Sequence, residues 1–425
     1  MPGARWAIAA VALALALAAA TGIARADLAI DEVRIVGRAA PGAPWRDGPT
    51  EARLDGRPEL MVVGVARERG RRVYLVDPVE ERVELGGRAV RAGDRRPWPA
   101  EVAARWSLVE PHAFRQADRR SPVGTATAWH SNVSTDPGDF GRWLGYDEIT
   151  YFETRLPGKA RGPAARRRAA LVRPSSREED VHGGLGTIRY KVDVTLPGGR
   201  VLATPGARAV DRYGILPTVH RVSVRRDDTI LGHLTAYFLV PEVFGSAGPG
   251  RNHQTERFVG ADCADVLTGA VRRAGYQKVW HTSASALGRY ARVVAGPAVL
   301  DESGHPDRPI RGVVAGDIVR IDYGGSLTGA TPRSWDHVGL LWRDRSDPDG
   351  PARGGPDGAL DGFDLVVHMG HPRLEVEPLS EQSPARVDVL RWDSRRLGAP
   401  VRTVPSRARH RIKPDDPVGP RRPAR

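Results

Sequence analysis

Cysteine is almost absent from this chain of 425 residues, in which Cys263 is the only one. A single cysteine cannot form an internal disulfide, so stability has to come from hydrophobic cores, which a chain of this length can supply. Lysine is nearly as scarce: 60 of the 64 basic residues are arginine, and the net charge is +13. This charge favours acidic partners, such as anionic envelope polymers, without indicating a catalytic activity.

Long hydrophobic runs are absent after residue 26. Before it, Arg5 precedes an unbroken apolar run over residues 6–20, and small residues at Ala24 and Ala26 mark a cleavage site. The pattern predicts a signal peptide over residues 1–26 and export to the periplasm, the cell envelope or the medium. An uncleaved anchor is the alternative. We expect no stable transmembrane segment once the signal peptide is removed. We also expect no nucleic-acid partner.

Residues 27–245 are rich in short strand patterns separated by Gly, Pro and charged turns. The spacing predicts two β-rich domains, at 27–110 and 111–245, with sandwich or barrel-like sheets. The clearest strand covers residues 188–196, where apolar and polar side chains alternate. Another strand is predicted over 230–240. The run of three arginines that begins at Arg166 predicts a solvated loop.

The composition changes at residues 245–250, which read as a linker, and a helical pattern follows. Apolar residues recur at helical spacing after Cys263, and Gly275 is placed to cap the carboxyl end. Asp262 is suited to the turn or to the amino-terminal cap. The helix dipole at this end favours negative charge, so we expect a lowered pKa for the Cys263 thiol and a nearby general base.

Three strand patterns with polar residues follow this helix. Gly316-Asp precedes the first, His337-Val-Gly opens the second, and His368 lies in the third. Together with Asp-Cys263 at the head of a helix, they resemble the NlpC-type branch of papain-like cysteine peptidases over residues 250–395. The resemblance implies an α+β protein in which the β-rich region precedes a papain-like domain, with the nucleophile helix packed on an antiparallel sheet.

The resemblance also implies catalytic roles. Cys263 would be the nucleophile, His337 the base that takes its proton, and His368 the group that orients the His337 ring. His371 lies close to His368 in sequence and is the alternative for this third role. The implied substrate is an amide bond in the peptide part of peptidoglycan, cleaved through an acyl-enzyme without a cofactor.

Two other functions fit the same residues. The first is a transglutaminase-like or deamidating acyl transfer, and the second is a non-catalytic envelope-binding protein with an inactive papain-like domain. The second alternative is credible because Ala264-Asp265 stands where the family usually has Ser-Gly. We expect no metal site, since the Asp-rich stretch 344–362 does not match an EF-hand and the histidines lack metal-ligand spacing. A basic, Pro-rich tail over 405–425 is expected to be disordered.

Overall fold

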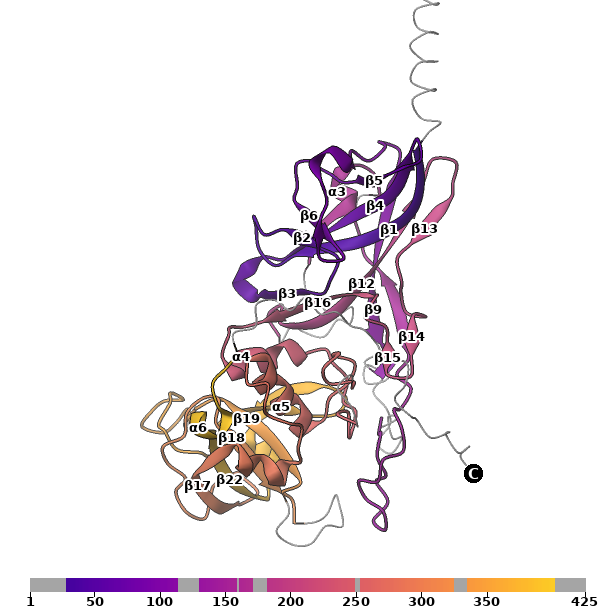
Figure 1. Ribbon diagram of the computed structural model, residues 1–425. Helices are drawn as coiled ribbons and strands as arrows, with labels where there is room; N and C mark the ends of the chain where they lie inside the picture. Colours follow the sequence, from indigo (N-terminus) through magenta and orange to yellow (C-terminus); the bar gives the residue numbers. More distant parts are fainter. Residues whose placement is uncertain are drawn as a thin grey trace, which may run out of the picture.

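The computed structural model describes residues 28–113, 130–158, 160–170, 182–248, 253–324 and 335–401. The predicted signal peptide and the basic tail lie outside these residues. The class is mixed α+β with mostly strands and few helices, and one sheet curls into a half-barrel. Figure 1 shows the sheets following one another from the indigo end to the yellow end of the chain. Within the described ranges, no helix combines the length and apolar character that membrane crossing requires.

The first sheet contains most of the amino-terminal strands. Its order is β7-β6-β2-β1-β4-β5-β8, with β11 also paired to β4. The bounds are β1 Leu28–Arg38, β2 Trp45–Arg46, β4 Glu59–Glu68, β5 Arg71–Leu75, β6 Val83–Leu85, β7 Arg88–Ala89, β8 Arg95–Arg96 and β11 Arg167–Ala169. β1 and β4 pair antiparallel over almost their whole lengths.

The second sheet has the order β10-β9-β12-β16-β3, with β13 paired to β12. Its bounds are β3 Thr50–Arg53, β9 Ala103–Pro111, β10 Tyr151–Arg155, β12 Gly186–Thr195, β13 Val201–Ala203 and β16 His220–Arg225, and a small ribbon joins β14 Val210–Asp211 to β15 Gly214–Ile215. The predicted strand at 188–196 is confirmed by β12. The chain then turns at residues 197–199, and β13 pairs back onto β12.

The two predicted β-rich domains do not separate at residue 111. β3, from the first predicted domain, pairs in parallel with β16 of the second sheet. β11, from the second predicted domain, pairs with β4 of the first sheet. One hydrophobic core also runs from Ile30 through Ile188 to Leu267 and Leu390, so the sheets share continuous packing.

The third sheet takes its strands from the last part of the chain, in the order β17-β22-β18-β19-β20-β21. All its pairings are antiparallel. The bounds are β17 Ala291–Leu300, β18 Ile318–Asp322, β19 His337–Arg343, β20 Leu365–Met369, β21 Leu374–Pro378 and β22 Ala385–Trp392. The strands predicted around His337 and His368 are therefore confirmed as β19 and β20.

Among the residues that the structure describes, the helices are short apart from α5. They are α3 Pro163–Arg166, α4 Ile230–Leu234, α5 Cys263–Arg273 and α6 Ser394–Leu397, with 3₁₀ turns η1 Leu54–Gly56, η2 Ala92–Asp94, η3 Thr235–Tyr237, η4 Ala284–Arg289 and η5 Leu379–Gln382. In Figure 1, α4 and α5 lie between the second and third sheets. α4 contacts both β16 and α5, while α5 also contacts β19 and β20.

The strand predicted over 230–240 is wrong, because this segment forms α4 and η3. Thr229 caps α4, and its hydroxyl accepts a hydrogen bond from the Gly232 N–H at 2.9 Å. The Asp227 carboxylate in turn accepts the Thr229 N–H at 2.8 Å. This largely apolar segment is therefore helical, because local capping and burial against α5 override its strand-like pattern.

The solvated loop predicted at the arginine run is also wrong. The Arg166 side chain is only 2% exposed and pairs with Asp77 at 2.5 Å. It also donates to the Val102 carbonyl at 3.1 Å. The guanidinium of Arg168 lies over the rings of Trp106 and Tyr190. These arginines therefore hold α3 and β11 against the core, because a guanidinium can stack on an aromatic ring and donate hydrogen bonds at the same time.

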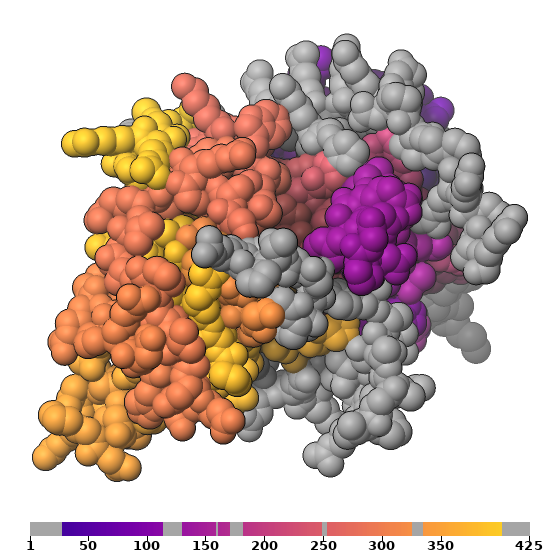
Figure 2. Space-filling view, turned by 90° about the horizontal axis from the view of Figure 1, so that it is seen from below, coloured from indigo at the N-terminus to yellow at the C-terminus, as the bar shows by residue number. Residues whose placement is uncertain are grey.

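Figure 2 shows, from below, the purple segment around residue 140 on the same face as the orange and yellow carboxyl-terminal residues. This segment is fixed by Asn132, which is fully buried. The Asn132 N–H donates to the Phe244 carbonyl at 2.9 Å, and its side-chain amide donates to the Gln254 side chain at 2.7 Å. The segment therefore packs against the chain that leads into α5.

Replacing Arg166 by Met should lower the free energy of unfolding by about 3–5 kcal/mol, because the Asp77 carboxylate would stay buried without its partner. Urea denaturation measures the change. The matched control is Arg67→Met, which removes an exposed pair with Asp31 and should cost less than about 1 kcal/mol. Equal effects at the two positions would contradict the assignment of Arg166 as a buried structural cation.

Candidate active site

The amino end of α5 is held by Asp262. Its carboxylate accepts hydrogen bonds from the Asp265 N–H at 2.7 Å and from the Gly245 N–H at 3.0 Å. At the other end, Gly275 has a φ of +107°, which favours a residue without a side chain. The predicted cap and helix end are both confirmed, and Cys263 takes the first helical position.

A chain of hydrogen bonds crosses the strands that α5 contacts. His337 Nε2 lies 2.9 Å from His368 Nδ1, and His368 Nε2 lies 2.9 Å from Glu377 Oε1. His337 opens β19, His368 lies in β20, and Glu377 lies in β21. The structure thus brings the two predicted histidines together and adds a carboxylate.

Gly339 explains why the histidines can meet. It pairs directly with His368 across β19 and β20. A Cβ at this position would approach His368 Cβ at 2.9 Å and the Val367 carbonyl oxygen at 2.8 Å. Residues 337 and 339 share one face of the strand, so the missing side chain leaves room for the His368 ring beside His337.

His371 does not take the third position. Its Nδ1 lies 2.9 Å from the Glu242 carboxylate instead. The ring that contacts His337 is that of His368, and the catalytic role of either histidine stays a prediction.

Glu377 was missed at the sequence level. It lies in the alternating pattern Leu374-Glu-Val-Glu, and β21 pairs His368 with Glu375. Glu377 is two residues further on and shares that face, so pairing register would have indicated it, but register is not visible in a single sequence. The Glu377 carboxylate also accepts a hydrogen bond from Gln382, which in turn accepts one from the Tyr323 hydroxyl.

The electrostatics at Cys263 oppose the expectation of a lowered thiol pKa. Burial raises the pKa of Cys263 well above its ordinary value, and the carboxylates of Asp262, Glu242 and Asp265 raise it further. The Ala264 N–H at the helix start acts in the other direction. The side chain of Cys263 is only partly buried, but the three carboxylates act together with desolvation, and the two effects outweigh a helix terminus that supplies at most about 2 kcal/mol.

His337 is neutral in this state. Burial, together with the neighbouring His368, lowers the pKa of His337 to about 3. Within the described residues, no hydrogen bond joins the Cys263 thiol to this ring. The two groups are therefore a thiol and a neutral imidazole, not a preformed thiolate–imidazolium pair.

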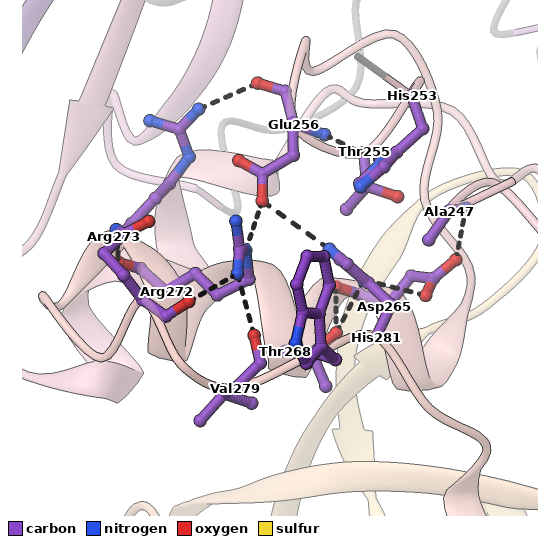
Figure 3. A network of polar contacts seen from close by, with 12 residues as sticks. Ala247, His253, Thr255, Glu256, Asp265, Thr268, Arg272, Arg273, Val279 and His281 are labelled. Carbon is purple, nitrogen blue, oxygen red and sulfur yellow. Dashed lines mark hydrogen bonds and ion pairs between the residues drawn. The ribbon is translucent and has the colours of Figure 1, made fainter. Parts of the chain in front are cut away.

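A second polar cluster flanks α5 and is drawn in Figure 3. Potential ligand atoms of His253, Glu256 and His281 all lie within 4.8 Å of one another. The sequence predicted no metal site, because the histidines lack metal-ligand spacing: His253 and Glu256 precede α5, and His281 follows it. His281 Nδ1 contacts Asp265 at 2.9 Å, and the two carboxylates raise the pKa of His281 to about 9.

A cavity of about 80 Å³ lies elsewhere, at the edge of the second sheet. Arg189, Arg221, Arg257 and Tyr213 contribute to its lining, whereas Cys263 and the two site histidines do not. Burial lowers the pKa of Arg189 to about 10. The cavity is therefore separate from the predicted catalytic residues.

No protein-family model, curated protein or solved structure matches this chain. The NlpC-type resemblance consequently stays a prediction that depends on the site residues themselves.

Replacing Glu242 by Gln should move the pH profile of Cys263 alkylation to lower pH, because a carboxylate that disfavours the thiolate is removed. In the wild type, the profile should lie above the ordinary thiol pKa of about 8.5. Iodoacetamide alkylation rates measured against pH give both curves. Glu302→Gln, on an exposed turn, is the control and should leave the profile unchanged. A wild-type thiol that reacts fast at pH 7 would contradict this account.

Proposed function

We propose that this protein is an exported cysteine hydrolase that cleaves amide bonds in cell-envelope peptides, with Cys263, His337 and His368 as its catalytic residues. The observation that carries the proposal is the hydrogen-bond chain from His337 through His368 to Glu377. A mere strand-end histidine would not require a second imidazole and a carboxylate behind it. Such an orienting chain is what a catalytic base needs.

The hydrogen bonds from His337 through His368 to Glu377 determine which ring nitrogens carry protons. The His368 hydrogen bond lowers the pKa of Glu377, so its carboxylate is charged and accepts from His368 Nε2–H. His368 Nδ1 is then the acceptor, and His337 Nε2–H is the donor. His337 Nδ1 keeps its lone pair, and it is the nitrogen that can take the thiol proton.

The reaction follows from this tautomer. As Cys263 Sγ attacks the carbonyl carbon, its proton passes to His337 Nδ1, because neither group is charged beforehand. His337 then protonates the leaving amine, and an acyl-enzyme remains. Water attacks the thioester and gives a proton to His337; the C–S bond then breaks to release the acid, and His337 returns the proton to the Cys263 sulfur. Backbone N–H groups at the start of α5 can stabilise the oxyanion.

The envelope peptide as substrate rests on the NlpC-type resemblance and on the signal-peptide prediction. The net charge of +13 supports association with anionic envelope polymers. The role of the β-rich region would be to hold the domain against such a surface.

One observation favours the non-catalytic alternative. The raised pKa of Cys263, and the lack of a hydrogen bond between its thiol and the His337 ring in the described part of the chain, are expected of an inert thiol in a binding protein. A hydrolase requires that substrate binding brings the thiol and the ring into contact, as catalytic hydrogen bonds often tighten only in the complex. Turnover of wall peptides distinguishes the two functions.

Incubation of the purified mature protein with peptidoglycan fragments should release new amine and carboxylate ends, detected by mass spectrometry. Cys263→Ala should abolish the products, and His337→Ala should lower kcat at least about 10³-fold. Adding a primary amine tests whether water or an amine accepts the acyl group. Binding of fragments without products from the wild type would support the non-catalytic alternative.

Glu377→Gln should lower kcat by at least about 10-fold with little change in KM, because an amide can reverse the tautomers of both histidines. The expected readout is the split between kcat and KM together with the pH profile of kcat. Glu302→Gln, on an exposed turn, is the matched control, since it makes the same change outside the hydrogen-bond chain. Equal losses in the two variants would indicate a structural role for Glu377.

A further inference from the structure

His253, Glu256 and His281 converge beside α5 from two separate segments of chain. His253 and Glu256 lie on the turn that precedes the helix, and His281 lies on the segment that follows it. The rings of His253 and His281 are 4.4 Å apart, edge to face. Figure 3 shows Glu256 and His281 pointing toward one another across the side of the helix.

The contacts of His281 fix its tautomer. Its Nδ1 lies 2.9 Å from Asp265 Oδ1 and 2.8 Å from Thr268 Oγ1. The Thr268 hydroxyl is itself directed at the Ala264 and Asp265 carbonyls at 3.1 Å, so it accepts from the ring. Both contacts place a proton on Nδ1, and Nε2 is the atom that faces Glu256.

That Nε2 atom is buried and has no hydrogen-bond partner. The side chain is only 10% exposed, and the closest carboxylate oxygen, Glu256 Oε1, is 3.6 Å away. This distance is too long for a hydrogen bond. A protonated Nε2 would therefore have no acceptor for its N–H, and an unprotonated Nε2 would have no donor for its lone pair. An ion between the two groups would satisfy both.

The surroundings match those of a metal ligand set. A ligating histidine commonly donates its other ring N–H to a carboxylate, as His281 does to Asp265. Asp265 is held in turn by Ser246 Oγ at 2.8 Å and the Ala247 N–H at 2.7 Å. Ligating carboxylates are also hydrogen-bonded, and Arg272 Nε donates to Glu256 at 2.5 Å.

His253 completes the set. Its side chain is buried at 4% exposure, and one of its ring nitrogens lies within 4.8 Å of the ligand atoms of Glu256 and His281. An ion-pair network among His281, Asp265 and Glu256 would need no second imidazole. The position of His253 beside these residues therefore favours a metal site over such a network.

We propose that His253, Glu256 and His281 bind a divalent transition-metal ion, with Asp265 orienting His281. Two imidazoles and one carboxylate suit Zn²⁺ and disfavour Ca²⁺ and Mg²⁺, which prefer oxygen ligands. Neighbouring ligands of tetrahedral zinc lie about 3.3 Å apart, and the present separation of 3.6 Å between His281 and Glu256 is close to this value. The ion would tie together the two segments that flank α5.

The test uses tag-free, full-length protein stripped with a chelator and titrated with Zn²⁺ by calorimetry, with the bound metal counted by mass spectrometry. We expect one tight Zn²⁺ site and a raised melting temperature, and neither with Mg²⁺ or Ca²⁺. His253→Gln and His281→Gln should each weaken Zn²⁺ binding at least about 100-fold, and Asp265→Asn about 10–100-fold.

Two controls make the result specific. Cys263→Ala should keep the site, since the thiol is not among the ligands, and His305→Gln, at an exposed turn, should leave affinity unchanged. Circular dichroism checks that each variant is folded, and His253→Gln alone decides the matter if His281→Gln unfolds. Absence of uptake by the wild type, or uptake that depends on Cys263 but not on His253, would overturn the proposal. Neither outcome depends on whether the protein is a hydrolase.

Discussion

The carboxylates of Asp262 and Asp265 both lie in the desolvated region at the amino end of α5. Burial and the Asp265 charge raise the pKa of Asp262, while bonds to His281, Ser246 and Ala247 hold the pKa of Asp265 down. The pair can coexist there because Asp262 accepts the N–H groups of Asp265 and Gly245, while Asp265 accepts the Ala247 N–H and the Ser246 hydroxyl. These two groups fix the start of α5, add to the high thiol pKa of Cys263 and orient His281.

The same constraint shapes the proposed chemistry. A thiolate beside buried carboxylates is disfavoured, and the paired imidazole is neutral, so charge would have to develop during attack and not before it. In that setting the alignment of His337 by His368 and Glu377 matters more than the resting charge of the thiol. Electrostatic stabilisation then has to come from groups that meet the transition state.

The β-rich region owes its form to strands exchanged between sheets. β3 and β11 each join the sheet that the other half of this region builds, and Arg166, directly before β11, links that segment to the core through Asp77. Pairing between strands far apart in the chain cannot be predicted from local sequence. The alternation of residues in a strand indicates which face is apolar but not which other strand it pairs with. The boundary expected at residue 111 failed for this reason.

Local signals determined much of what surrounds the site. The Asp262 cap, the apolar spacing of α5, Gly275, and the strands that carry His337 and His368 could all be predicted, since each depends on contacts a few residues apart. Tertiary structure alone decided that His368 and not His371 meets His337, and that Glu377 stands behind it. It alone also decided that burial keeps Cys263 protonated and that His253 and His281 meet across α5, because register, burial and long-range packing come from the whole chain.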